Sequence, residues 1–141
     1  MEVKIKYLPG SPKLEKTSIG SWIDLYVYED TELKSGQRAY ISQGVSMQLP
    51  EGYEAIIAPR SSTYKRWGLL QTNSIGVIDH AYCGDDDDWK MPVLATRDIV
   101  IPKGVRICQF RIQKEQPDFD FVEVDHLDGK NRNGFGAATG V

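Results

Sequence analysis

Residues 58 to 68 read A-P-R-S-S-T-Y-K-R-W-G, so Arg60, Ser61 and Ser62 stand after an apolar segment and before a possible helical turn. Backbone N–H groups at such a turn, two hydroxyls and a guanidinium can form a phosphate cradle, because arginine binds phosphate oxygens bidentately. An ordinary strand end with a serine N-cap and a surface arginine would give the same short pattern. Both interpretations remain open for this segment alone.

Residues 72 to 85 read T-N-S-I-G-V-I-D-H-A-Y-C-G-D and place Asp79 after a β-branched pair. In a strand, Asp79 points to the face opposite Ile78 and His80. A carboxylate at the end of a buried strand can be tuned by desolvation and by its neighbours, which suits a general base. An Asx-turn that ends the strand would explain the same residues, so this segment alone leaves both possibilities open.

The run Asp85 to Asp88 could attract a hard cation, since such ions bind clustered carboxylates. Four adjacent acids more often form a solvated loop, because consecutive side chains diverge and repel one another, and we favour that interpretation. The sequence contains no G-x-S-x-G elbow, no Walker-type phosphate loop and no zinc-deaminase signature, and its histidines are His80 and His126.

Composition bounds the class of protein. The 141 residues suit one domain, 40% are hydrophobic and 26% are charged, which is typical of a globular chain. No apolar run approaches the roughly 20 residues of a membrane span, and the net charge of -3 gives no support for nucleic-acid binding. The N-terminus alternates charged and apolar residues like a strand and not like an export signal, so we expect a cytoplasmic protein. Cys83 and Cys108 have no metal-binding spacing and are expected to be free thiols.

The elements that must position these side chains are mostly strands. Period-2 alternation or short β-rich runs predict strands, which cover residues 3–7, 22–28, 45–49, 53–58, 74–78, 92–96, 108–112 and 121–124. A short helix fits only at residues 63–67. The pattern predicts an all-β barrel or jelly-roll-like sandwich over residues 1–128. Residues 129–141 are rich in Gly and Ala, and we expect a mobile tail, which could still serve as a lid.

Five segments, taken in order, resemble the motifs of the trimeric dUTP diphosphatase (dUTPase) family over nearly the whole chain. They are I-D-L-Y at 23–26, P-R-S-S at 59–62, N-S-I-G-V-I-D-H-A-Y-C-G at 73–84, G-V-R-I-C-Q-F at 104–110 and R-N-G-F-G-A-A-T-G at 132–140. The resemblance implies a jelly-roll or distorted β-barrel fold and hydrolysis of dUTP to dUMP and pyrophosphate.

Roles for individual residues follow from this resemblance. Asp79 matches the carboxylate that activates water for in-line attack on the α-phosphate. Residues that match phosphate-binding positions are Arg60, Ser61, Ser62, Gln109, Arg132 and Thr139. Mg²⁺ is expected on the triphosphate oxygens, with Asp24 reaching its hydration shell through water. No dense protein metal cage is therefore expected.

The family resemblance also assigns substrate recognition and assembly. Residues that match the uracil and deoxyribose site are Asn73, Gly76, Val77, Ile78, Tyr82 and Phe135. A ring packed on the sugar leaves no room for a ribose 2′-hydroxyl, and a tight hairpin leaves none for a thymine methyl. A homotrimer is implied, with active sites shared between subunits and the tail closing over a neighbour's substrate.

Some features depart from the family pattern. Lys130 holds the usual place of the tail arginine, so either Lys130 or Arg132 meets the γ-phosphate, and Trp89 in the acidic insertion could supply a second aromatic group near the base. The nearest alternative is dCTP deaminase, which shares the fold but needs a glutamate in the strand after the third motif, where this chain has M-P-V-L-A-T. A nucleotide-dependent regulatory protein and a purely structural β-domain are the remaining alternatives.

Overall fold

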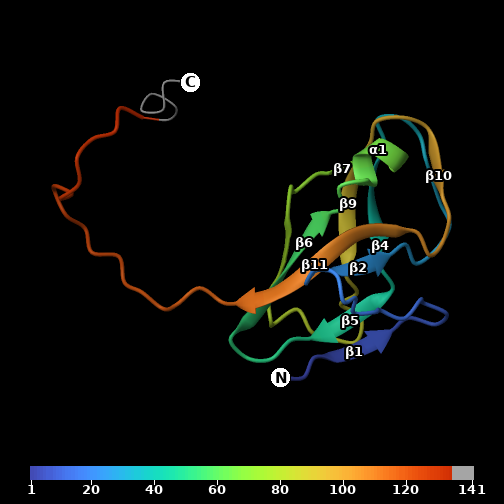
Figure 1. The fold of residues 1–141 in the computed structure, drawn as a ribbon, viewed down its shortest axis with the longest axis horizontal. Helices are drawn as coiled ribbons and strands as arrows, with labels where there is room; N and C mark the ends of the chain where they lie inside the picture. The colour runs from blue at the N-terminus through green and yellow to red at the C-terminus, as the bar shows by residue number, and fades with distance from the viewer. Residues whose placement is uncertain (135–141) are drawn as a thin grey trace.

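The computed structural model describes residues 1–134, and within them the chain forms short strands and one helix (Figure 1). In chain order these are β1 (Lys4–Tyr7), β2 (Ile23–Tyr26), β3 (Thr31–Leu33), β4 (Arg38–Ser42), β5 (Val45–Gln48), β6 (Tyr53–Pro59), α1 (Thr63–Trp67), β7 (Leu69–Gln71), β8 (Gly76–Ile78), β9 (Lys90–Ala95), β10 (Ile99–Ile101) and β11 (Arg106–Lys114). No helix in this part of the chain is long and apolar enough to cross a membrane.

The strands form four antiparallel sheets that wrap around one core (Figure 1). The largest sheet has the order β2-β11-β6-β8, a second has the order β4-β9-β7, and β1-β5 and β3-β10 form two-stranded pairs. Neighbouring strands are often distant in sequence, as β11 between β2 and β6 shows. This arrangement confirms the all-β, jelly-roll-like fold that the sequence pattern predicted.

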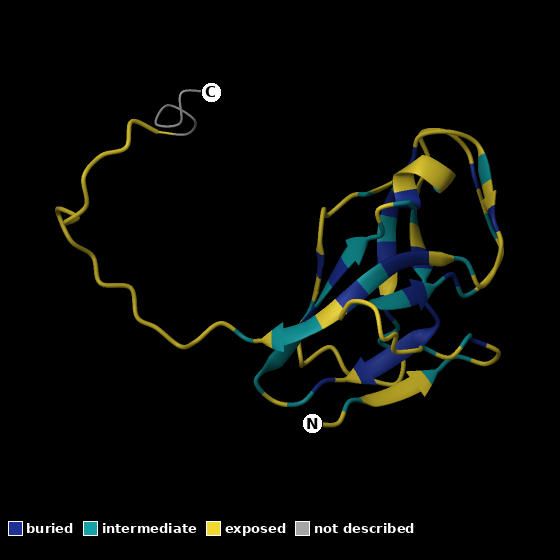
Figure 2. Cartoon of the chain, in the orientation of Figure 1, coloured by how far each residue is buried: buried dark blue, intermediate teal, exposed yellow. Residues whose placement is uncertain are grey.

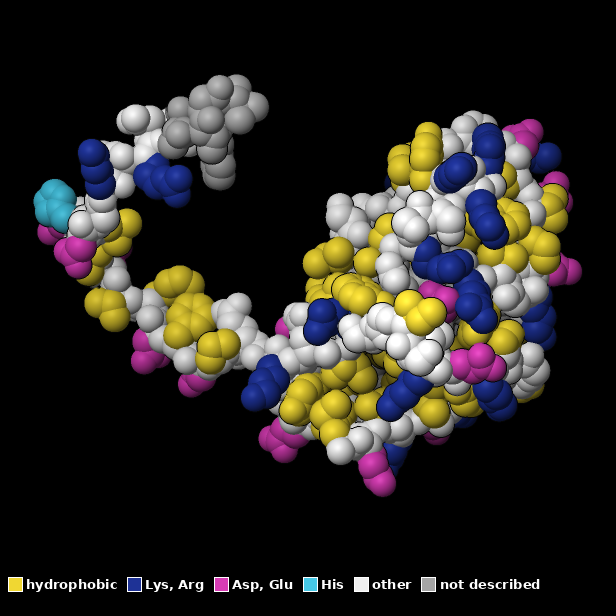
Figure 3. Space-filling model, viewed as in Figure 1, with side chains coloured by type: hydrophobic (Ala, Val, Ile, Leu, Met, Phe, Trp, Pro, Cys, Tyr) yellow, Lys and Arg dark blue, Asp and Glu magenta, His cyan; other side chains and the backbone are white. Residues whose placement is uncertain are grey.

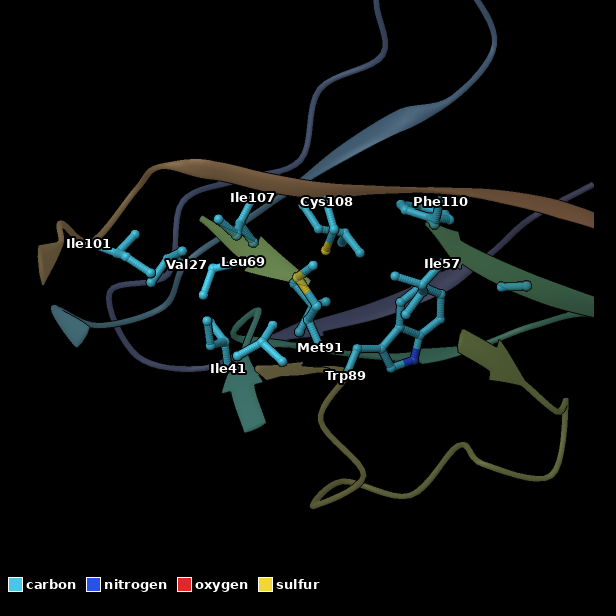
Figure 4. Packing of buried hydrophobic residues seen from close by; sticks show 14 of the residues in the cluster. Val27, Ile41, Ile57, Leu69, Trp89, Met91, Ile101, Ile107, Cys108 and Phe110 are labelled. Atoms are coloured by element: carbon cyan, nitrogen blue, oxygen red, sulfur yellow. The ribbon is translucent and has the colours of Figure 1, made fainter. Parts of the chain in front are cut away.

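The core lies between the sheets and includes an aromatic pair (Figure 4). The rings of Trp89 and Phe110 meet edge to face with centroids 5.1 Å apart, and Trp89 has no exposed surface. Leu25, Ile57 and Met91 are also fully or almost fully buried. The hypothesis that Trp89 stacks near a bound base is therefore wrong, because its ring fills the interior of the barrel.

Most predicted elements are confirmed. The helix at Thr63–Trp67 and seven of the eight predicted strands are present, with ends that shift by a few residues. Four short strands, β3, β4, β7 and β10, were not predicted. Each has only three to five residues, too few for alternation to be distinguished from a loop.

The predicted strand at residues 121–124 is wrong. Its residues have strand-like composition, but a strand also needs a hydrogen-bonding neighbour, and none is available along the described chain. Residues 116–134 are exposed throughout and extend away from the barrel (Figure 2). We call residues 116–134 the arm. The boundary at residue 128 stays a prediction, although the chain leaves the barrel after Glu115.

Trp89→Ala should lower the free energy of unfolding by about 3–5 kcal/mol, because it removes a buried ring and leaves a cavity. Urea denaturation at fixed protomer concentration measures this change. Ile19→Ala is the control, since Ile19 is 88% exposed and its removal should change the free energy by no more than about 0.5 kcal/mol. Equal stability of the two variants would contradict the central role of the Trp89 ring.

Candidate active site

The register of the largest sheet places Asp24 and Gln109 side by side. Gln109 on β11 lies opposite Asp24 on β2 and opposite Ala58 on β6. Directly opposed residues share one face of an antiparallel sheet, and the alternate residues Leu25 and Cys108 are buried in the core. Asp24 and Gln109 therefore lie on the outer face, beside the point where β6 ends and the P-R-S-S segment begins.

Asp24 lies between two guanidinium groups. Its Oδ1 atom is 3.1 Å from Arg60 Nε and its Oδ2 atom is 3.4 Å from Arg106 Nη1. Arg60 Nη1 also donates to the main-chain oxygen of Arg106 at 3.1 Å. Because the Asp24 side chain is 22% exposed, this pairing fixes the geometry of Arg60 more than it adds stability. Arg106 stands in the fourth motif, and its contact with Asp24 was not predicted from the sequence.

The P-R-S-S segment is fixed to β11 through Thr63. The Thr63 hydroxyl accepts a hydrogen bond from Arg60 N at 2.9 Å and donates one to Ile107 O at 2.8 Å, in a site with 1% exposure. Ser62 stands at the N-cap position of α1, as the serine N-cap alternative expected, but its hydroxyl makes no capping hydrogen bond. Ser61 is exposed and Ser62 is half-buried, and their hydroxyls are not needed to hold the helix. The two hydroxyls therefore remain free for a ligand.

A hollow of about 280 Å³ opens beside this segment. It is lined by Arg60, Ser62, Arg66, Trp67, Val105 and Arg106. Figure 3 shows several Lys and Arg side chains gathered on this side of the barrel. Gln109 Nε2 donates to Pro59 O at 3.1 Å, which keeps the amide at the edge of the segment. Guanidinium groups, hydroxyls and an amide at one surface suit a polyanionic ligand such as a phosphate chain.

The hairpin before β8 holds the first residues of the third motif. Asn73 Oδ1 accepts a hydrogen bond from Gln71 Nε2 at 3.0 Å, and Ser74 has a φ of 61°, which sharpens the turn. At Gly76 a Cβ would lie 3.2 Å from the Ile57 side chain, so glycine allows β8 to lie close to β6. The hairpin therefore has a defined shape, with Asn73 and Ser74 exposed at its tip.

Asp79 follows β8 and is exposed. Val77 on the same strand is 52% exposed, so the expectation that Asp79 ends a buried strand is wrong for the described chain by itself. The main-chain oxygen of Asp79 accepts a hydrogen bond from Tyr82 N at 3.0 Å, which closes a turn. His80, whose contact was not predicted, pairs through Nδ1 with the Glu115 carboxylate at the end of β11. This contact joins the Asp79 loop to the root of the arm.

The two groups of candidate residues lie at opposite ends of β6. Ile78 pairs with Ala55, which places Asp79 level with Glu54, whereas Arg60 follows the other end of the strand. Six residues of strand at about 3.3 Å each separate them by about 20 Å. The structure thus brings Asp24, Arg60, Ser61, Ser62 and Gln109 together, but it does not place Asp79, Asn73 or Tyr82 next to them within one chain.

The remaining candidates belong to the C-terminal segment. Lys130 and Arg132 are exposed on the arm, and the structure gives neither an ion-pair partner among residues 1–134. Phe135 and Thr139 lie outside the described residues. The choice between Lys130 and Arg132 as the cation for the γ-phosphate stays open.

Comparison of the sequence with known proteins finds dUTPases. The dUTPase family model matches residues 15–139. The chain is 51% identical over 138 residues to the SPbeta prophage-derived deoxyuridine 5'-triphosphate nucleotidohydrolase YosS of Bacillus subtilis, covering 97% of each chain.

Solved structures show the same fold. A mutant dUTPase of Staphylococcus bacteriophage 80alpha with dUpNHpp superposes with a TM-score of 0.78 at 19% identity, covering 97% of this chain and 98% of that one. A mutant dUTPase from phage phi11 of S. aureus, which coordinates a structural Mg(II) ion, superposes with a TM-score of 0.76 at 17% identity, covering 90% of this chain and 100% of that one.

Cys108, directly behind Gln109, should make stability depend on alkaline pH. Burial, and to a lesser extent the negative charge of Asp24, raises the pKa of the Cys108 thiol far above its usual range. The unfolded thiol ionises near pH 8.5 while the folded thiol stays protonated, so its contribution to stability is full below that pH and falls as pH rises further.

Unfolding curves at pH 7.5 and pH 10 measure this effect. Cys83→Ser, which leaves Cys108 as the remaining cysteine, should lose more stability between these pH values than Cys83→Ser/Cys108→Ala, by about 1 kcal/mol or more. Lysines and tyrosines also ionise at alkaline pH, but both variants contain the same ones, so their effect on stability cancels in the difference between the variants. Identical losses would show that the thiol ionises as readily in the folded chain.

Proposed function

Because the chain belongs to the dUTPase family, we propose that it hydrolyses dUTP to dUMP and pyrophosphate, with Asp79 activating the water that attacks the α-phosphate. The observation that carries the proposal is the meeting of Arg60, Gln109 and Asp24 at the P-R-S-S segment. A relative that is 51% identical over nearly its whole length is named for this activity.

The phosphate chain binds at the outer face of the β2-β11-β6-β8 sheet. The Arg60 guanidinium and the hydroxyls of Ser61 and Ser62 bind phosphate oxygens, with the Gln109 amide as a further donor. The contacts of Arg60 with Asp24 and with Arg106 O hold its fork in place before substrate arrives. Because the donors are preorganised, little conformational entropy is lost on binding.

The protein groups at this site fit a magnesium ion that arrives with the nucleotide. Among residues 1–134 there is no group of three His, Cys, Asp or Glu side chains that could hold a metal. Asp24 is a single, partly exposed carboxylate, which suits a contact through water and not a protein cage. The ion would be held mainly by triphosphate oxygens and would neutralise charge on the phosphate chain.

Catalysis and base recognition belong to the third motif. Asp79 accepts the proton of the attacking water at its carboxylate, and its exposure leaves both oxygens open to water and substrate. Asn73 and the backbone from Gly76 to Ile78 bind the polar edge of uracil. Tyr82 lies against the deoxyribose and excludes a ribose 2′-hydroxyl.

A homotrimer with shared active sites accounts for the separation of these groups. Since Asp79 and Arg60 of one chain lie about 20 Å apart, Asp79 must act on a phosphate chain bound by a neighbouring subunit. The arm carries exposed apolar side chains, including Phe121, which is 93% exposed, and a neighbouring subunit would cover them. Arg132 or Lys130, with Phe135 and Thr139, then closes over the neighbour's substrate. The free thiols Cys83 and Cys108 suit the reducing cytoplasm.

Asp79→Asn should keep dUTP binding but lower kcat by about 100-fold or more, the scale expected for removal of a positioned general base. Pyrophosphate release from dUTP with Mg²⁺ measures kcat, and calorimetry with a non-hydrolysable dUTP analogue measures binding. Asp86→Asn, in the exposed acidic loop, is the control and should retain full activity. Full turnover by Asp79→Asn would reject its role as the base.

The same assay distinguishes the enzyme from a dCTP deaminase. The wild-type chain should release pyrophosphate from dUTP and much less from dTTP, UTP or dCTP. Ammonia release from dCTP would overturn the proposed activity.

Deleting residues 130–141 should lower dUTP turnover by about tenfold or more and leave the melting temperature unchanged, because this segment supplies the lid and the described part of it makes no contact with the barrel. Turnover and thermal melting are measured on the same preparation. A truncated chain that no longer folds would contradict the lid assignment.

Mixing two kinds of impaired subunit tests whether an active site is built from more than one chain. Asp79→Asn subunits and truncated subunits, each weakly active alone, should regain activity when they are unfolded and refolded together, because some hybrid sites then combine a native Asp79 with a native tail. Absence of any recovery, with mixed trimers verified by mass spectrometry, would show that each chain builds its own site.

A further inference from the structure

We propose that Asp88, the last residue of the acidic run, is a positioning residue that fixes the ring of Tyr82 and thereby sets the preference for deoxyribose over ribose. This inference rests on the proposed function, since it gives a role to a loop beside the sugar site. Its basis is a set of contacts that separate Asp88 from the other three aspartates.

The four acids of the run differ in their surroundings. The Asp85 side chain is 85% exposed and pairs with Lys6 at 3.5 Å, a weak surface contact. Asp86 is exposed and has no hydrogen bond or ion pair to any described residue. Asp87 accepts a hydrogen bond from Gly84 N at 2.9 Å, within its own loop. The Asp88 side chain, in contrast, is only 15% exposed.

The contacts of Asp88 hold it to the barrel. Its Oδ2 atom accepts a hydrogen bond from the Ser42 hydroxyl at 2.7 Å, and its Oδ1 atom is 3.2 Å from Lys90 Nζ. The next residue, Trp89, is fully buried, and its N–H donates to Val45 O at 2.8 Å. The main-chain carbonyl of Asp88 therefore belongs to a fixed part of the molecule, although the preceding loop is exposed.

The main-chain carbonyl of Asp88 accepts a hydrogen bond from the Tyr82 hydroxyl at 3.1 Å. The other end of the same residue is held by Tyr82 N, which donates to Asp79 O at 3.0 Å. Tyr82 is thus fixed at its main chain and at the tip of its ring, while the residue as a whole is 38% exposed. An exposed tyrosine without the second contact would sample other rotamers.

A fixed ring discriminates better than a mobile one. Steric exclusion of a 2′-hydroxyl requires that the ring cannot move aside, so its strength depends on the restraint on Tyr82. Loosening the ring should weaken dUTP binding and admit UTP more readily. The chemical step should change little, because the Asp79 carboxylate takes no part in these contacts.

The experiment compares Tyr82→Phe, Asp88→Ala and the matched control Asp86→Ala. KM and kcat are measured for dUTP and UTP, and folding is checked by thermal melting. Tyr82→Phe removes only the hydroxyl that donates to Asp88 O, and Asp88→Ala removes the side-chain contacts with Ser42 and Lys90 that help to hold this acceptor. Both should lower the ratio of kcat/KM for dUTP over UTP by about threefold to tenfold, the effect of losing one hydrogen bond. The change should be mainly in KM, and Asp86→Ala should match the wild type.

The double variant Tyr82→Phe/Asp88→Ala tests whether the two residues act together. Its discrimination should equal that of Tyr82→Phe, because Asp88 has no hydroxyl left to hold. The inference would be overturned if the losses of discrimination in the two single variants multiplied in the double variant, or if Tyr82→Phe discriminated as well as the wild type. In either case, hydrolysis of dUTP by the wild-type chain would leave the proposed function standing. A wild-type chain that does not hydrolyse dUTP would overturn the proposed function itself, and with it this inference.

Discussion

The pairing of β11 with β2 on one side and β6 on the other is the constraint on which the rest of the molecule depends. Side chains alternate between faces along β11, so Cys108 and Phe110 enter the core while Gln109 lies outside. A slip of one residue would expose Cys108 and bury Gln109. The same register that closes the core therefore also places Gln109 between Asp24 and Ala58.

A local irregularity in this pairing shapes the cationic end of the site. The register between β11 and β2 shifts between Arg106 and Cys108, which is a β-bulge. Bulges increase local twist and redirect side chains. The bulge lies at Arg106, whose guanidinium contacts Asp24 and whose main-chain carbonyl accepts a hydrogen bond from Arg60. One face of β11 thus packs into the core, while its outer face holds the ion pairs of Asp24 with Arg60 and Arg106.

The sequence predicted those features that depend on neighbouring residues. Alternation along residues 108–112 and the short helix after Arg60 are local, and both are confirmed. The contacts of Asp24 with Arg60 and Arg106 join residues far apart in the chain, so no local pattern could predict them. The burial of Trp89 was misjudged for a similar reason. The sequence suggested a second aromatic group near the base at Trp89, whereas the ring that packs against it, Phe110, lies on a strand distant in sequence.

The distance between Asp79 and the P-R-S-S segment is set by the length of β6 and not by side-chain rotamers. β8 pairs with the first half of β6, and the P-R-S-S segment follows its last residue. The rise of an extended chain keeps these points about 20 Å apart, more than an aspartate and an arginine side chain can span together. No rotamer change within one chain can therefore bring Asp79 into contact with Arg60. If the third motif supplies the base, the smallest catalytic unit contains more than one chain, and assembly becomes a condition of activity.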